Sequence, residues 1–487
     1  MHSAGDCCGT TAPTDLPRFL VDSQPSRPTV PSCLGSTTQW PEKVPWTDMK
    51  GRRPVWAEPS RGDGHSDRSV QMICALLIAV LLAFRTFAAP RRLEESSALP
   101  PLRFTPNGTF QISIFEDLHF GENAWDAWGP QQDINSVKVI GEVLDVEQPQ
   151  LVVLNGDLIT GENAYLENAT VYVDQIVAPL VQRNLTWAST YGNHDSEFNL
   201  SRHDMLARER RYPNARTTQM VFGNESGVSN YYLPVYPSNG TDEPCLILWF
   251  FDSRGGYDFQ TLDASGDEVG QPDWVDVSVV RWFTQTRDGL KVTYGRDIPS
   301  LAFVHIPTNA SQALQTEAGV DPHLQPGIND DEILAQQAQG WCADGRDDPP
   351  CTYGGQDGPF MEALTQTPGL MGVFSGHDHG VTWCYRWDTL LPGMTVEGNG
   401  INLCFGQHSG YGGYGSWIRG ARQILVTEAM VQQHEIDTWI RLESQDVVGA
   451  VTLNATYNHD SYPATDDTMT HCPTCNCTSA TPMPGTS

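Results

Sequence analysis

The hydrophobic positions of this chain follow two alternating patterns, short apolar runs and longer stretches with helical spacing. Apolar runs of strand length, which predict buried strands, cover residues 110–115, 151–154, 186–191, 301–304 and 370–374. Helical spacing is found in residues 134–146, 169–183, 200–211, 274–286 and 331–339. The alternation of the two patterns predicts an α/β fold.

Each of the five apolar runs is followed by side chains that can bind a metal ion. These residues are Asp117, His119, Asp157, Asn193, His305, His377 and His379. In open α/β sheets the active site lies at the carboxyl ends of the strands, so we expect these side chains to meet. Two ions about 3.5–4 Å apart need a shared anionic bridge and several further ligands each. The sequence therefore predicts a binuclear metal site.

Within this set, Asp157 is the natural bridge because it follows a strand and Gly156, which lets the backbone approach the metals. His194 lies beside the ligand Asn193 and stays free for acid chemistry. Asp195 either orients the His194 imidazole or caps a helix that starts near Glu197. Taken singly, an Asp after a strand is commonly a turn or cap residue, and a buried His is commonly a core residue. The ordered set favours metal binding over these structural explanations.

The same motifs carry a resemblance to a known family. The order D-x-H, G-D, G-N-H-D, a lone His and G-H-D-H, read over residues 111–407, resembles the calcineurin-like metallophosphoesterase superfamily. The strings at 115–122, 156–163 and 408–414 resemble a fungal and plant subgroup similar to purple acid phosphatases. The resemblance implies a four-layer αββα sandwich of two mixed β-sheets flanked by helices. Late strands near 396–405, 423–428 and 436–442 would complete the second sheet.

The resemblance also implies a role for each ligand. One ion would be held by Asp117, His119, Asp157 and His379, and the other by Asp157, Asn193, His305 and His377. A hydroxide on the ion pair would attack phosphorus, and His194 would protonate the leaving group. True purple acid phosphatases have Gly at the position of His119 and a metal-binding Tyr at the position of Thr160. We therefore expect no tyrosinate-to-iron colour, and the metal pair stays open among Fe, Zn and Mn.

The sequence thus predicts metal-dependent hydrolysis of phosphomonoesters, acting on a small phosphorylated substrate or a phosphoprotein. The alternatives are a phosphodiesterase with the same site and a catalytically silent, secreted metal-binding protein. Arg254, just after an expected strand at 245–251, either contacts phosphate or is an ordinary ion-paired Arg. His408 is followed by a loop rich in Gly and Tyr, which either approaches the substrate or only forms tight turns.

The expected domains follow from composition. Residues 1–71 lack apolar periodicity, so they are either a disordered segment or a gene-model artefact upstream of a true start at Met72. The apolar stretch 73–84 predicts a signal peptide at 72–89, with a signal anchor as the alternative, because it is shorter than the about 20 residues of a membrane span. The catalytic domain is expected at 90–445 and a polar, Cys-containing tail at 446–487.

Two further features predict export to the cell exterior or a vacuolar lumen. N-glycosylation sequons occur at Asn107, Asn168, Asn184, Asn199, Asn224, Asn239, Asn309, Asn454 and Asn476. The cysteines after Ala89 are even in number, which in an oxidising compartment indicates disulfides. We expect the pairs Cys342 with Cys351 and Cys384 with Cys404, and disulfides rather than zinc in the tail Cys472, Cys475 and Cys477. No stable membrane insertion is expected after signal removal.

The net charge excludes one class of partner. The formal charge is −30, and only Lys138 and Lys291 remain as lysines after Ala89. Such a surface repels nucleic acid backbones and anionic membranes, so no nucleic acid partner is expected. An acidic medium would titrate part of this charge, which suits an enzyme of acid-phosphatase type.

Overall fold

The computed structural model describes residues 99–331, 338–341, 352–466 and 468–470. Several expectations lie outside these residues: the segments 1–71 and 72–89, most of the helix at 331–339, the pair Cys342 with Cys351, and the tail cysteines. No helix among the described residues has the length and apolar composition that crossing a membrane requires.

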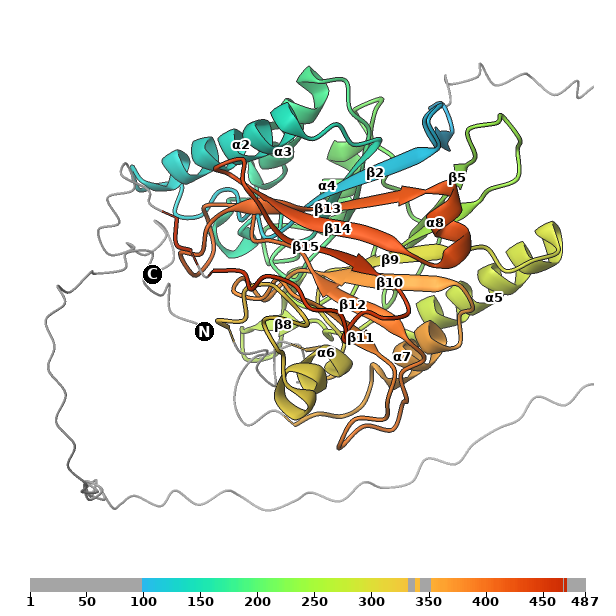
Figure 1. Cartoon of the computed structure of the whole chain (residues 1–487). Helices are drawn as coiled ribbons and strands as arrows, with labels where there is room; N and C mark the ends of the chain where they lie inside the picture. Colours follow the sequence, from blue (N-terminus) through green and yellow to red (C-terminus); the bar gives the residue numbers. More distant parts are fainter. Residues whose placement is uncertain (1–98, 332–337, 342–351, 467, 471–487) are drawn as a thin grey trace, which may run out of the picture. The chain divides into compact units, whose positions relative to one another are not determined.

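Two mixed sheets form the centre of the molecule (Figure 1). The seven-stranded sheet contains, in spatial order, β1 (Leu102–Arg103), β5 (Tyr231–Tyr236), β6 (Leu246–Phe251), β9 (Ser300–Val304), β10 (Leu370–Ser375), β12 (Ile401–Phe405) and β11 (Cys384–Trp387). The six-stranded sheet contains β15 (Val447–Leu453), β14 (Ile436–Leu442), β13 (Gly420–Thr427), β2 (Thr109–Phe115), β3 (Leu151–Asn155) and β4 (Trp187–Thr190). A separate hairpin contains β7 (Tyr257–Leu262) and β8 (Glu268–Gly270).

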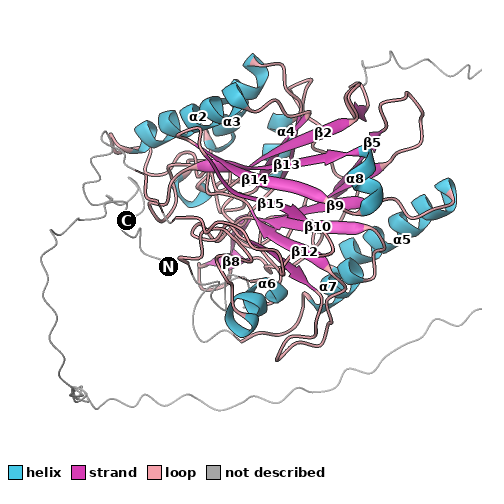
Figure 2. Cartoon of the chain, viewed as in Figure 1, coloured by secondary structure: helices cyan, strands magenta, loops and turns pink. Residues whose placement is uncertain are grey.

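Helices cover the outer faces of both sheets (Figure 2). Helices α2 (Gly129–Val146) and α3 (Tyr172–Gln182) pack on the six-stranded sheet, whereas α5 (Val277–Tyr294) and α7 (Gly358–Thr365) pack on the seven-stranded sheet. The shorter helices are α4 (Arg202–Glu209), α6 (Asn309–Ala313) and α8 (Glu428–Gln433). This arrangement confirms the expected α/β fold with two mixed sheets flanked by helices.

The alternation of side chains along β6 shows how the layers are held together. Leu246, Leu248 and Phe250 enter the core between the two sheets, while the intervening Ile247, Trp249 and Phe251 enter the core beneath α5 and α7. Successive strand residues point to opposite faces, so a strand buried on both faces must be apolar throughout. That requirement explains why the inner strands are visible in the sequence as continuous apolar runs.

Parallel pairing brings the functional loops together. In the six-stranded sheet β2, β3 and β4 are parallel, and in the other sheet β6, β9, β10 and β12 are parallel. The carboxyl ends of the parallel strands within each sheet therefore lie at one edge, and the loops that leave those edges carry the expected ligands.

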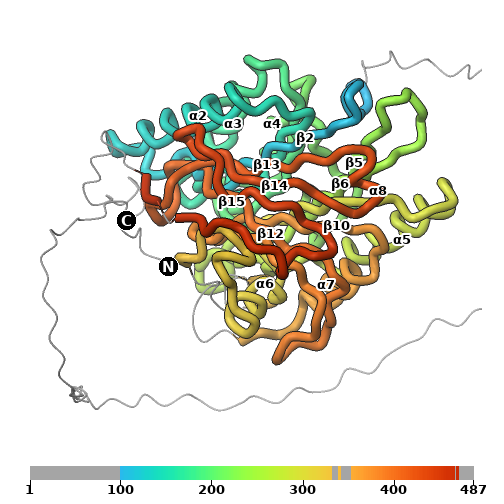
Figure 3. The backbone as a smooth tube through the Cα atoms, viewed as in Figure 1, coloured from blue at the N-terminus to red at the C-terminus, as the bar shows by residue number. Residues whose placement is uncertain are grey.

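Two expectations about the last strands are wrong. The strands β12, β13 and β14 do not share a sheet, because β12 pairs with β10 whereas β13 pairs antiparallel with β2 (Figure 3). The expected polar tail also begins too early, because β15 pairs with β14 and buries Leu453. β15 is at the edge of the six-stranded sheet, and of its seven residues only Val451 and Leu453 are buried. The expected disulfide between Cys384 and Cys404 is confirmed, joining opposite residues of β11 and β12.

Candidate metal centre

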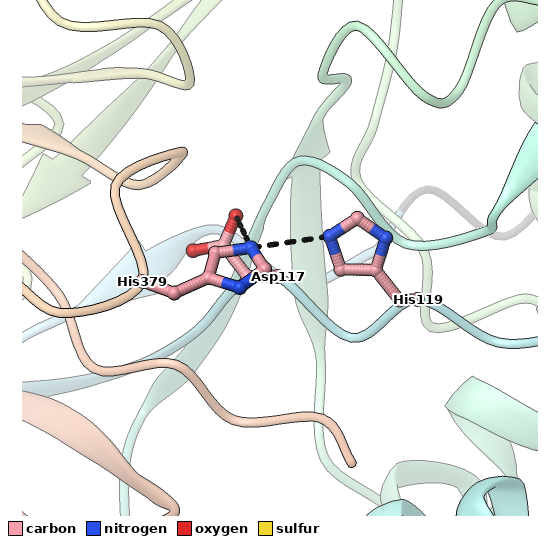
Figure 4. A group of neighbouring side chains, drawn as sticks. All are labelled: Asp117, His119 and His379. Carbon is pink, nitrogen blue, oxygen red and sulfur yellow. Dashed lines mark hydrogen bonds and ion pairs between the residues drawn. The ribbon is translucent and has the colours of Figure 1, made fainter. Parts of the chain in front are cut away.

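Six of the seven expected ligands lie in two groups, in which every residue is buried except the half-buried His377. The first group contains Asp117, His119 and His379, and the second group contains Asp157, His305 and His377. Within each group the potential ligand atoms all lie within 4.8 Å of one another. In the first group, Nε2 of His379 lies 3.3 Å from Nε2 of His119 and 3.7 Å from Oδ1 of Asp117 (Figure 4).

The two groups lie next to each other, with a carboxylate of each facing an imidazole of the other. Nε2 of His119 is 3.8 Å from Oδ2 of Asp157, and Nε2 of His305 is 3.9 Å from Oδ1 of Asp117. Asp157 also lies 2.9 Å from Nε2 of His305 in its own group. A carboxylate in contact with both groups is what a pair of ions sharing an anionic bridge requires.

The backbone at the strand ends is shaped for this convergence. Asp117, His119, Asp157 and His377 all have positive φ, between 48° and 76°. Non-glycine residues rarely adopt this conformation, which costs on the order of 1–3 kcal/mol each and concentrates at functional sites. A Cβ atom on Gly156 would lie 2.4 Å from Nδ1 of His305, so only glycine allows the close approach expected before Asp157.

Unpaired buried atoms show that the residues fit a metal pair. Oδ1 of Asn193 is buried without a hydrogen-bond partner, and so is Nε2 of His305, whose contact with Asp157 lacks hydrogen-bond geometry. Asn193 lies between Gly192, on which a Cβ atom would touch Asp157, and His194, whose backbone N–H donates to Asp157 over 2.9 Å. Buried polar atoms are rarely left unpaired, so these two atoms are suited to bind cations.

Burial sets the charge of the ligands. It lowers the pKa of His119 to about 4 and that of His377 to about 3, which leaves both imidazoles in the neutral form that binds metals. Burial and the neighbouring Asp157 raise the pKa of Asp117 to about 7, although His305 opposes them. Burial also disfavours charge on Asp157, but His305 and His194 hold its pKa well below its usual range. The site thus concentrates negative charge on Asp157, the expected bridge.

His194 has a partner that sequence reasoning did not find. Its Nδ1 lies 2.9 Å from Oε2 of Glu162, and its ring centroid is 5.0 Å from that of His119. The expected partner, Asp195, is instead used by the backbone: its carboxylate accepts N–H groups of Leu158, Ile159 and Gly192. The role given to Asp195 is therefore wrong, because its short side chain closes the turn under the site. In the sequence, Glu162 could have been considered as this partner because it is a carboxylate only five residues after Asp157.

The two residues expected to contact the substrate, Arg254 and His408, form hydrogen bonds with neighbouring groups of the protein. The guanidinium of Arg254 packs against Trp274, to whose carbonyl its Nε donates over 2.9 Å, and the residue is buried. His408 has both ring nitrogens engaged, one with the carbonyl of Gly412 and the other with Arg419. Local structure therefore uses both ring nitrogens of His408, which leaves none of them for phosphate. In Arg254 only Nε is used, while Nη2 is buried without a hydrogen-bond partner, so phosphate binding by Arg254 stays a prediction.

Fold and site together define a metallophosphoesterase. The chain belongs to the calcineurin-like phosphoesterase family, whose sequence profile matches residues 114–381, and this family binds a dinuclear metal centre. The expected membership of the superfamily is confirmed.

Individual relatives agree with the expected subgroup. The chain is 26% identical over 376 residues to "Probable inactive purple acid phosphatase 14" of Arabidopsis thaliana, covering 71% of this chain and 83% of that protein. It is 29% identical over 352 residues to "Phosphatase DCR2" of Saccharomyces cerevisiae, covering 70% of this chain and 55% of the yeast protein. Among solved structures, a dimetal phosphatase from Danio rerio is similar with a TM-score of 0.41 and 13% identity, covering 71% of this chain and 98% of that one.

Proposed function

We propose that this protein hydrolyses phosphomonoesters with a pair of metal ions. The observation that carries the proposal is the pair of adjacent ligand groups, in which Asp157 faces an imidazole of each group. The family membership supports a phosphoesterase, and one relative is named a phosphatase. Other relatives are named probable inactive purple acid phosphatases, but this chain keeps all seven expected ligands and His194.

The ligands divide between the ions as the geometry of the groups suggests. Asp117, His119 and His379 would hold the first ion, His305 and His377 would hold the second with Asn193, and Asp157 would be the ligand common to both. When bound, the ions supply an activated water and neutralise charge on the phosphoryl oxygens. The mixture of carboxylate, imidazole and amide donors suits Fe, Zn or Mn. Thr160 places its hydroxyl 3.3 Å from Nδ1 of His119, at the position where a purple acid phosphatase has its metal-binding Tyr.

His194 supplies the proton for the leaving group. Because Glu162 holds Nδ1, the other ring nitrogen is available to donate to the oxygen that departs from phosphorus. The charge of Glu162 also favours the protonated imidazole. A positioned general acid contributes about 10²–10⁴ in rate. Glu162 thus has the orienting role that the sequence had suggested for Asp195.

The proposed compartment is the cell exterior or a vacuolar lumen. Asn107, Asn184, Asn224 and Asn239 are sequon residues with exposed side chains, and Cys384 and Cys404 form a disulfide, both of which suit the secretory route. Small phosphorylated molecules or phosphoproteins are the proposed substrates. The strongly acidic composition supports the absence of a nucleic acid partner.

The test compares para-nitrophenyl phosphate with its bis ester, with Fe, Zn and Mn supplied in turn. We expect faster hydrolysis of the monoester; faster hydrolysis of the diester would make the protein a phosphodiesterase. Absence of turnover with every metal would indicate a silent metal-binding protein. Asn193→Ala should lose one metal ion and most activity, while the exposed Asn224→Ala should lose neither. A fully active Asn193→Ala protein would remove Asn193 from the ligands.

A further inference from the structure

The Gly/Tyr-rich loop, residues 408–419 between β12 and β13, packs against the first metal group and has no part in the mechanism above. We propose that this loop is a clamp that positions His379 and His119 for the first ion, so that it sets the affinity of that ion selectively. The inference rests on the dinuclear centre of the proposed function. It concerns positioning residues, Tyr414 and His408, that lie far from the other metal motifs in the sequence.

Tyr414 and His408 flank the imidazole of His379. The Tyr414 ring is stacked on it, with centroids 4.0 Å apart and an angle of 11° between the planes, and the His408 ring lies 3.9 Å away. Nδ1 of His379 is 2.7 Å from the carbonyl oxygen of Tyr414. Nδ1 therefore carries the proton, and Nε2 keeps the lone pair that a metal ion needs. A hydrogen bond of this kind fixes both the tautomer and the orientation of a metal ligand.

Tyr414 also holds the backbone that carries this ligand. Its hydroxyl accepts the backbone N–H of His379 over 3.1 Å and donates to the carboxylate of Asp331. Main chain and side chain of His379 are thus both tied to one tyrosine. Removing the hydroxyl alone should loosen the ligand less than removing the whole ring.

His408 is itself fixed by a buried arginine. Nη1 of Arg419 donates to Nδ1 of His408 over 2.9 Å, and Nε2 of His408 lies 3.0 Å from the carbonyl of Gly412. The guanidinium of Arg419 also donates to the carbonyls of Trp417 and Gly415, and only 2% of the residue is exposed. Arg419 therefore joins the two ends of the loop and presses a neutral His408 ring against His379.

The loop reaches both imidazoles of the first group through its glycines. Gly413 has φ +74°, and a Cβ atom there would lie 2.6 Å from Cε1 of His379 and 2.7 Å from Cδ2 of His119. A Cβ atom on Gly412 would lie 2.3 Å from the carbonyl oxygen of His119. The backbone of the loop thus lies directly against the two ligands. The second group is supported differently, since Nδ1 of His305 lies 2.9 Å from the carbonyl of Asn155 at the end of β3.

The test measures binding of Mn²⁺ to metal-free full-length protein by the electron paramagnetic resonance signal of the free ion. The unmodified protein should bind two ions. In Tyr414→Leu and His408→Ala one of the two dissociation constants should rise by about 10–100-fold, the usual effect of losing such a supporting contact, while the other stays unchanged. Tyr414→Phe, which keeps the ring, should show a smaller rise.

The matched control is Tyr411→Phe, in the same loop. The Tyr411 hydroxyl bonds Glu443 and Thr470 instead of a ligand, so both dissociation constants should stay as in the unmodified protein. Circular dichroism of each variant reports folding, and Tyr414→Phe keeps the test decisive if Tyr414→Leu does not fold.

Three results would overturn the clamp. Variants that bind both ions as tightly as the unmodified protein would show that the loop does not support the ligands. Equal weakening of both ions would show general loosening instead of selective positioning. Fewer than two ions on the unmodified protein would refute the dinuclear centre itself and the clamp with it, so the two failures are distinguishable.

Discussion

The two metal groups are built from the same kinds of residue but are supported in different ways. In the second group Asp157 and His305 each follow a central strand within one or two residues, and His305 is tied to the β3 backbone at Asn155. In the first group His379 lies four residues beyond β10 and depends on Tyr414 and His408, which come from a loop between the two sheets. The second ion would thus be held by residues at strand ends, whereas in the first group only Asp117 follows its strand, β2, within two residues.

This difference implies that the two ions are not equivalent. Loops open at a lower free energy than the inner strands of a sheet, because fewer buried contacts must break. The loop-supported first ion should therefore exchange faster and bind more weakly than the second ion.

Loss of the shared ligand should have the largest effect, because it abolishes the distinction between the ions. Asp157→Ala removes the carboxylate that contacts both groups, so we expect activity to fall by at least about 10³-fold, several kcal/mol of transition-state stabilisation. Metal analysis should find both ions weakened. The control is Asp267→Asn, an exposed residue of the loop between β7 and β8. Two tightly bound ions in Asp157→Ala would exclude Asp157 as the bridge.

Two single variants, each lacking one imidazole from one of the groups, should distinguish the affinities of the two ions. His379→Ala should retain the tighter ion, whereas His305→Ala should retain only the weaker one. Both variants should lose activity by about 10²-fold or more, because each ion neutralises charge in the transition state. Calorimetric titration with Zn²⁺ gives the two affinities. The opposite order of affinities would mean that support by the loop is the stronger of the two.

Metal removal offers a test without mutation. A chelator added to the loaded protein should remove the ions in two kinetic phases, with the first ion leaving in the faster phase. Hydrogen exchange followed by mass spectrometry should show faster exchange in residues 408–419 after that phase, while β3 and β9 stay protected. Simultaneous release of both ions, or early exchange in β3, would contradict the proposed difference.

His194 is next to both groups, since it follows Asn193, an expected ligand of the second ion, and its ring lies 5.0 Å from that of His119 in the first group. Glu162→Gln removes the charge that orients it. For alkyl phosphates, whose leaving groups need a proton, we expect kcat to fall by about 10–100-fold. For para-nitrophenyl phosphate, whose leaving group is stable as an anion, kcat should change little. An equal loss for both substrates would show that Glu162 acts on the structure in general instead of on the general acid.

The sheet-supported part of the molecule was largely predictable from the sequence. Strands β3, β9 and β10 are buried on both faces, so each appears as a continuous apolar run, and a ligand follows each run. Their parallel order then places the ligands together without any knowledge of side-chain contacts. The loop-supported part was not predictable in the same way. Nothing in the spacing of Tyr414 and His408 indicates that they pack on His379, because loop geometry has no repeating pattern.

Two errors have the same origin. Adjacency in the sequence favours Asp195 as the partner of His194, yet adjacent residues in a tight turn point in different directions. The strand β15 lies at the edge of its sheet with only two of its seven residues buried, and its sequence lacks the strict apolar–polar alternation that predicts a half-buried strand. In both cases tertiary packing decided what local sequence could not.

The smallest expected effect concerns the charge behind the first group. Asp133, on α2, accepts the backbone N–H of Gly121, two residues after His119, over 3.0 Å. Burial raises the pKa of Asp133 to about 7, although the hydrogen bond from Gly121 opposes the shift. The folded pKa is above the unfolded value of about 3.9, so the stabilising contribution is fully present below that value and is lost as the pH rises through about 7.

Asp133→Asn keeps an acceptor for the N–H of Gly121 but carries no charge. The melting temperature of this variant, relative to that of the unmodified protein, should therefore increase as the pH rises. The gain at pH 8 relative to pH 5 should correspond to at most about 3 kcal/mol, measured by thermal unfolding of the metal-free protein. Asp267→Asn, at the surface, should show no such trend. A gain that is the same at both pH values would mean that the Asp133 charge does not oppose folding. The loop behind His119 would then be supported independently of pH, as the β3 backbone supports His305.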